Sequence, residues 1–112
     1  MRKDDIVRLR HMLDASIEAV SFVKNKTRNS LDDDRKLVLS LVKSIEIIGE
    51  AAANVTTECR KEFSHIPWRD IISMRNRLIH AYFDINLDIL WKTVEEDLPP
   101  LIADLEKIVT KA

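Results

Sequence analysis

The chain has 112 residues, enough for one ordinary domain with no room for a second, so we expect a single domain over residues 1–112. It is 46% hydrophobic and 33% charged, with one glycine and three prolines, which argues against a disordered chain and disfavours a turn-rich β-sandwich or barrel. Its 18 basic and 19 acidic residues give a net charge of −1, which argues against nucleic-acid binding over the whole surface.

A single cysteine, Cys59, excludes an intrachain disulfide and a multi-cysteine metal site, and it fits a reducing compartment. No uninterrupted apolar run approaches the roughly 20 residues that a membrane-spanning helix needs. The first residues lack the apolar stretch of a signal peptide. We therefore expect a soluble, cytoplasmic protein.

Apolar residues at steps of three and four predict a first amphipathic helix from about Asp4 to Lys26, followed by a polar loop. Ser30 stands three residues before Asp33, which resembles a capping box, and acidic residues suit the N-terminus of a helix. We therefore expect a second helix to begin at Ser30, and its apolar spacing can carry it as far as Cys59.

Gly49, the only glycine, falls inside this second helix, where glycine costs about 1 kcal/mol relative to alanine. One interpretation is that a neighbouring helix packs closely at this point. The other is that Gly49 leaves space beside a functional site, with Glu50 next to it. We favour the packing interpretation, and both stay open at this stage.

Pro67 suits the first turn of a third helix, which should end near residues 82–83. Asp84 or Asn86 can cap a fourth helix, which the pair Pro99–Pro100 breaks or kinks before a last helix. Four or five helices with short connections predict an all-α, antiparallel bundle.

Positive charge concentrates on the third helix. Residues 65–82 hold three arginines against one aspartate, a net charge of +2, whereas residues 83–98 hold one lysine against five acids, a net charge of −4. The basic stretch is a candidate anion site. The alternative is that its polar groups simply pair with the acidic fourth helix.

Helix geometry refines this site. At 3.6 residues per turn, Asn76 and His80 lie about 40° apart, Arg77 lies about 60° from His80, and Arg75 and Tyr82 are separated by about 20°. Arg75 and His80 are about 140° apart, so they do not meet on one straight helix. Bringing them together requires the reach of the arginine, an irregular helix end or a second copy of the chain.

Arg75, four intervening residues, His80, one residue and then Tyr82 resemble the motif of HepT-like toxins in the HEPN superfamily. Asn76 also fits, because HEPN proteins favour a polar residue directly after the motif arginine. The resemblance extends to three further blocks, at residues 45–52, 66–71 and 97–101. Four blocks in the right order are far more specific than the arginine–histidine spacing alone.

The resemblance implies a HEPN-like homodimer that is the toxin of a type VII-like toxin–antitoxin system, with an MntA-type nucleotidyltransferase as its antitoxin. It implies an endoribonuclease that acts on RNA without a metal or other cofactor, with Arg75 and His80 as catalytic residues at a dimer-related cleft. Tyr82 resembles the tyrosine to which the antitoxin attaches AMP. The supporting residues of the predicted site are Gly49, Glu50, Asn76 and Arg77.

The chemistry of these residue types agrees with that implication. Metal-free RNA cleavage needs a group that titrates near neutrality to move a proton, and a histidine such as His80 meets this need. It also needs a cation for the charge that grows on the phosphoryl oxygens, which the fork of Arg75 can supply. The alternative function is a non-catalytic helical dimer that binds a nucleotidyltransferase or RNA.

Overall fold

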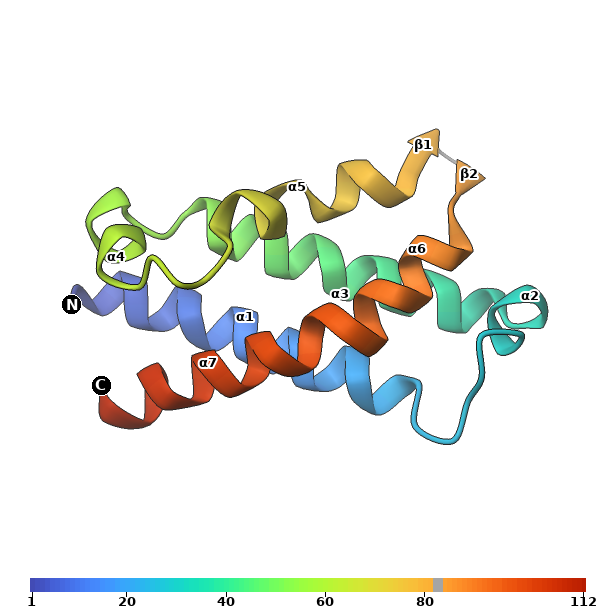
Figure 1. Ribbon diagram of the computed structural model, residues 1–112, viewed down its shortest axis with the longest axis horizontal. Coiled ribbons are helices and arrows are strands. Elements are labelled where there is room, and N and C mark those ends of the chain that lie inside the picture. The colour runs from blue at the N-terminus through green and yellow to red at the C-terminus, as the bar shows by residue number, and fades with distance from the viewer. Residues whose placement is uncertain (82–83) are drawn as a thin grey trace.

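The structure, a computed structural model, describes residues 1–81 and 84–112, and at positions 80 and 81 it describes the backbone alone. Long helices run antiparallel through these residues, as the sequence predicts (Figure 1). In chain order the elements are α1 (Lys3–Phe22), α2 (Ser30–Asp33), α3 (Arg35–Ala53), α4 (Thr57–Glu62), α5 (Trp68–Leu78), β1 (Ile79–Ala81), β2 (Asp84–Ile85), α6 (Leu87–Lys92), the π-helical turn η1 (Thr93–Asp97) and α7 (Leu98–Lys111). The predicted all-α bundle is confirmed, with β1 and β2 as a minor antiparallel pair.

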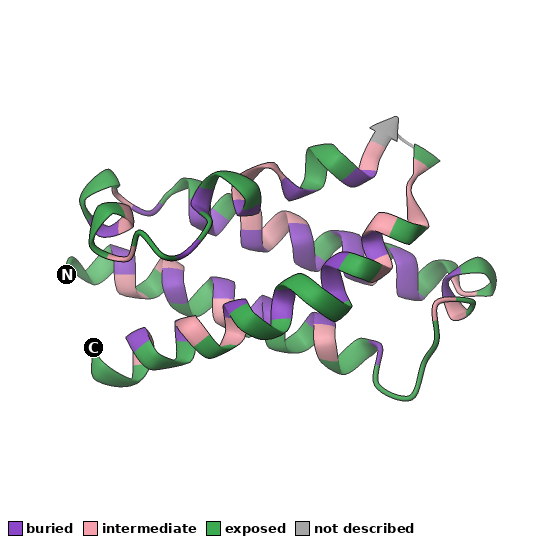
Figure 2. Cartoon of the chain, viewed as in Figure 1, coloured by how far each residue is buried: buried purple, intermediate pink, exposed green. Residues whose placement is uncertain are grey.

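The core lies along the inner faces of the long helices (Figure 2). Helix α1 packs between α7 and α3, and α3 packs between α1 and α5. Side chains with no exposed surface come from each part of this row: Leu9, Met12, Leu41, Ile45, Ile48, Leu78, Leu90, Leu98 and Leu105. Helix α3 is thus packed on both sides, against α1 and against α5, and this packing fixes its position relative to α5. Within the described part of the chain, no helix has the length and apolar character needed to cross a membrane.

The predicted second helix is divided in the structure. It is not one continuous helix from Ser30, because the helical conformation is interrupted at Asp34, between α2 and α3. The Asp34 side chain accepts a hydrogen bond from the Leu37 amide at 3.0 Å and so caps the start of α3. Aspartate side chains compete in this way with helical backbone bonds, which favours a helix start over a helix interior.

The far end of that helix is also earlier than the sequence suggested. Helix α3 ends at Ala53, and Cys59 belongs to the separate helix α4. Thr56 begins α4, because its hydroxyl oxygen accepts a hydrogen bond from the Cys59 amide at 3.2 Å. The Thr56 hydroxyl and amide in turn donate to the Asp5 carboxylate, at 2.7 and 2.9 Å. Asp5 therefore ties the start of α1 to the start of α4.

We predict that Asp5→Ala lowers the free energy of unfolding by about 3–6 kcal/mol, because Asp5 accepts two hydrogen bonds and each hydrogen bond to a charged group contributes about 1.5–3 kcal/mol. The Asp5 side chain is buried, with 2% of its surface exposed, so water cannot readily replace it as a partner of Thr56. Urea denaturation measures the change. The neighbouring, exposed Asp4→Ala is the matched control, and an equal effect of the two substitutions would contradict the role of the buried contact.

The prolines at 99 and 100 do not break the helical segment that runs from α6 through η1 into α7. They lie in the first turn of α7, where missing amide hydrogens cost little. The turn before them, η1, is a π-helical segment that lets the chain run on from α6 into α7 (Figure 1). Asn86 caps α6, since its side-chain oxygen accepts from the Ile89 amide at 3.0 Å.

The third helix ends earlier than predicted. Helix α5 stops at Leu78, and not near residues 82–83 as its composition indicated. Ile79 adopts an extended backbone and pairs with Ile85, while the Asn86 amide donates to the Leu78 carbonyl at 2.7 Å. These contacts come from a later part of the chain, and they compete successfully with the continuation of the helix.

Candidate functional site

Four of the predicted site residues line one pocket. This pocket of about 240 Å³ lies between α3 and α5 and is bordered by Gly49 and Glu50 from α3 and by Arg75 and Asn76 from α5. Its remaining lining residues are Ile45, Glu46, Ala53 and Ile72. The fold therefore brings together residues that are some 25 positions apart in the sequence.

Gly49 serves both interpretations that its position raised. A Cβ atom at Gly49 would lie 3.5 Å from the carbonyl oxygens of Ile71 and Ile72, so the backbone of α5 passes directly over this point of α3. This is an ordinary van der Waals distance, and it confirms close packing of the two helices. The same glycine also borders the pocket beside Arg75 and Asn76. Gly49 thus lies both where α5 packs on α3 and at the edge of the pocket.

Arg75 forms an ion pair that the sequence did not indicate. Its Nε donates to Oε1 of Glu46 on α3 at 3.2 Å, and the two side chains are 52% and 31% exposed. In the described part of the chain, the two terminal nitrogens of Arg75 have no hydrogen-bond partner. The guanidinium is therefore held at its inner nitrogen, and no side chain of the described residues occupies its outer fork, whose geometry suits an anion.

For Arg75, this contact replaces the alternative that the polar groups of the basic stretch pair with the acidic fourth helix. The carboxylate that Arg75 contacts belongs to α3. Glu46 was missed as a site residue, although Glu46 and Glu50, four residues apart on one helix, must lie on the same face. That spacing was the available signal.

Arg77 lies away from this pocket. Its Nη2 donates to the backbone oxygen of Asp70 at 3.2 Å. Arg77 instead borders a different pocket, of about 260 Å³, together with Glu96 and Asp97 of η1. The structure thus assigns the two arginines to different faces of α5, and Arg77 does not join Gly49, Glu50, Arg75 and Asn76 as the supporting residue we expected.

The remaining motif residues follow the end of α5. The backbone of His80 lies in β1, two residues beyond the last helical residue, Leu78. The helical angles that relate Arg75 and Asn76 to His80 therefore do not apply. The His80 side chain and the whole of Tyr82 lie outside the described residues, so their predicted roles stay predictions.

Cys59 offers no nucleophile. Burial raises the pKa of its thiol to about 11, and the nearby Asp5 carboxylate contributes to this rise. The thiolate is the reactive form of cysteine, so this side chain is a neutral part of the core near neutral pH. Among the residues that the structure describes, no group of three or more histidine, cysteine or acidic side chains could hold a metal ion.

Comparison with known proteins gives consistent matches. A model of the family described as "Ribonuclease HepT-like" matches residues 12–108. A protein of Thermococcus cleftensis named "Probable ribonuclease HepT" is 38% identical over 95 residues, which cover 81% of this chain and 86% of that protein. No solved structure gives a significant match.

A second relative is longer than this chain. A protein of Methanocaldococcus jannaschii named "Gamma-glutamylcyclotransferase and putative RNase" is 38% identical over 110 residues. The match covers 97% of this chain but only 49% of that protein. The chain therefore spans about half the length of this relative.

Proposed function

Since the chain belongs to the ribonuclease HepT-like family, we propose that it is a metal-independent endoribonuclease, the toxin of a type VII-like toxin–antitoxin system, in which Arg75 and His80 cleave RNA. The family match over residues 12–108 carries this proposal. The geometry around Arg75 supports it, because the guanidinium is anchored at Nε and its side chain borders a pocket. Cleavage of RNA by the purified protein in excess chelator is the direct test.

The proposed reaction uses only the chain's own groups. The 2′-oxygen of a ribose attacks the adjacent phosphorus and loses its proton, while the bond to the 5′-oxygen breaks and that oxygen gains a proton. His80 would take or deliver one of these protons, since histidine titrates near neutrality. Arg75 would stabilise the charge that builds on the non-bridging oxygens, and Asn76, in the same pocket, would orient the phosphate.

We further propose that the active form is a homodimer. One chain supplies one motif histidine, whereas the reaction requires both removal and delivery of a proton, so two copies of the motif at a shared cleft would complete the site. Light scattering at micromolar concentration should give twice the chain mass of 13.0 kDa. A mass of a single chain in a preparation that still cleaves RNA would contradict the shared cleft.

Control of this activity is proposed to act at Tyr82. It lies two residues after His80, so an AMP group on its hydroxyl would place a phosphate and a bulky nucleoside close to the motif. We expect an MntA-type nucleotidyltransferase to transfer AMP to Tyr82, with loss of ribonuclease activity. Mass spectrometry after co-expression with the partner should show the mass of one or more AMP units on a peptide that contains Tyr82.

The matched variant is Tyr82→Phe, which keeps the aromatic ring and removes the acceptor oxygen. It should remain active and escape neutralisation by the partner. AMP attached to a different residue, or a Tyr82→Phe protein that the partner still neutralises, would refute this mechanism of control. The assignment as a ribonuclease does not depend on this result.

A further inference from the structure

The fold sorts charges that the sequence mixes. Residues 57–70 carry three cations and three acids, with no net charge. In the structure, the three cations line a pocket of about 510 Å³ between α4 and α5: Arg60, Lys61 and Arg69. Two of the acids line other pockets, Glu62 at the chain termini and Asp70 beside η1. The pocket between α4 and α5, which we call the basic pocket, is bordered by no acid of the described residues.

Two of these cations are available to a ligand. Lys61 and Arg69 are exposed, and neither pairs with a carboxylate in the part of the chain that the structure describes. Arg60 is committed to the fold, because its Nε donates to the Val55 carbonyl at 3.2 Å and its Nη2 to the Ala53 carbonyl at 2.8 Å. Arg60 thus supplies a fixed positive charge, while Lys61 and Arg69 can move onto an anion.

The basic pocket adjoins the pocket that holds Arg75. Ile72 lines both of them. Arg69, Ile72 and Asn76 follow one another at steps of three and four, so they lie along one face of α5. At 1.5 Å per residue, Arg69 precedes Asn76 by about 10 Å along the helix axis. An RNA strand bound at Arg75 can therefore continue along this face of α5, past Lys61 and Arg69.

The charges near Arg75 explain why such a continuation is needed. That pocket sets one guanidinium against the carboxylates of Glu46 and Glu50, so it cannot attract a polyanion by itself. Phosphate contacts supply most of the affinity of proteins for single-stranded nucleic acids, and hydroxyl groups contribute to these contacts beside cations. The basic pocket offers two serine hydroxyls, from Ser64 and Ser73, along with its cations. Trp68 also borders it but is buried, with its indole N–H donating to the Phe63 carbonyl, so it is part of the core.

We propose that the basic pocket binds phosphates of the RNA strand that flank the bond cleaved at Arg75. This inference rests on the proposed ribonuclease function and adds a substrate-binding surface that lies outside the arginine–histidine motif. Lys61 and Arg69 are binding residues in this proposal, and they take no part in the chemical step.

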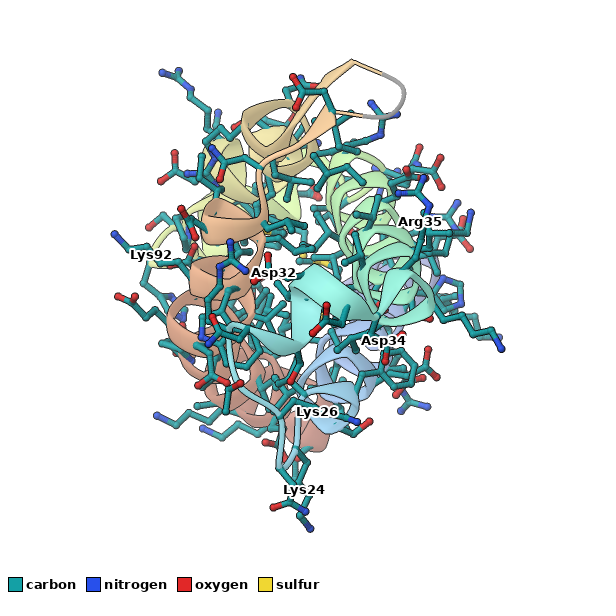
Figure 3. All side chains as sticks on the ribbon, turned by 90° about the vertical axis from the view of Figure 1, so that its right-hand side faces the viewer. Lys24, Lys26, Asp32, Asp34, Arg35 and Lys92 are labelled. Atoms are coloured by element: carbon teal, nitrogen blue, oxygen red, sulfur yellow. The ribbon has the colours of Figure 1, made fainter. Side chains whose placement is uncertain are left out.

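The test compares two double variants that remove the same charge. Lys61→Ala with Arg69→Ala removes the two available cations of the basic pocket. Lys24→Ala with Lys26→Ala removes two exposed cations from the loop after α1, which Figure 3 labels and which lies at the opposite end of the molecule from α4 (Figure 1). Binding of a fluorescent 2′-O-methyl oligonucleotide, which cannot be cleaved by attack of the 2′-oxygen, is measured by anisotropy at several salt concentrations.

We expect the Lys61/Arg69 variant to bind about tenfold more weakly, and the slope of log K against log salt to fall by about 0.7 for each phosphate that the variant no longer neutralises. With cleavable RNA, KM should rise while kcat changes little. The Lys24/Lys26 variant should match the wild type. Circular dichroism verifies that each variant is folded.

The outcomes separate this proposal from the proposed function. Wild-type protein that binds RNA through Lys61 and Arg69 but does not cleave it would support the basic pocket and count against the ribonuclease. A Lys61/Arg69 variant with unchanged affinity and salt slope would overturn the basic pocket and leave the ribonuclease standing. If the Lys61/Arg69 variant no longer forms the dimer, or no longer binds an acidic protein partner, but binds RNA as the wild type does, the basic pocket is a protein interface and the proposal is overturned.

Discussion

Replacing His80 by alanine is expected to lower the rate of RNA cleavage by about 10²–10⁴-fold, because a positioned acid–base group contributes about that much. In the proposed reaction, the 2′-hydroxyl loses a proton and the leaving oxygen gains one. Histidine is the only residue type in the Arg-x4-His-x-Tyr motif that ordinarily takes up and releases protons near neutral pH. The measurement is the initial rate on a defined RNA oligonucleotide, with wild type and variant at equal concentration. His80 lies in β1, beyond the core helices, so the variant should fold.

His65→Ala is the matched control, because it removes another histidine that is exposed and lies away from Arg75, in the pocket at the chain termini. It should cleave RNA at the wild-type rate. Full activity in His80→Ala would remove the acid–base role and favour the non-catalytic dimer that binds RNA or a nucleotidyltransferase.

Arg75→Ala is the second large effect that we expect, with cleavage reduced by about 10²–10³-fold through loss of charge stabilisation in the transition state. Arg75→Lys should restore little of this rate, because an ammonium group cannot reproduce both the bond from Nε to Glu46 and the free fork. Steady-state kinetics should show a lower kcat in both variants.

Arg77→Ala separates a defined site from a general basic surface. Arg77 carries the same charge two residues away, but it lies in the pocket beside η1 and bonds to the Asp70 backbone. Its loss should therefore reduce cleavage much less than the loss of Arg75. Equal losses for the two arginines would show that only the summed positive charge matters.

The long helices could be predicted because their apolar residues repeat at helical spacing over many turns. Their ends could not all be predicted, since some depend on contacts from distant parts of the chain. Helix α5 ends at Leu78 because Ile79 pairs with Ile85 and the Leu78 carbonyl accepts from Asn86. The sequence of residues 67–79 contains no signal for this pairing with residues 85 and 86.

The candidate site shows the same division. The motif placed Arg75 and Asn76 correctly on one helix, and the glycine inside α3 marked a point where the two helices approach closely. The partner of Arg75 was missed, because Glu46 lies 29 residues earlier and only the packing of α3 on α5 brings it near. The basic pocket could not be predicted from the sequence, because its cations are interspersed with acids there and only the fold brings the cations together without them.

Product analysis of wild-type cleavage in excess EDTA tests the central claim most directly. Attack by the 2′-oxygen without a metal ion requires that the purified protein cut an RNA oligonucleotide under these conditions and leave a 2′,3′-cyclic phosphate on the upstream fragment, which mass spectrometry identifies. We predict this product, and we predict that an oligonucleotide with a single 2′-deoxyribose at the cleaved position stays intact there. Cleavage that stops in EDTA, or that also occurs at the 2′-deoxy position, would contradict the proposed reaction.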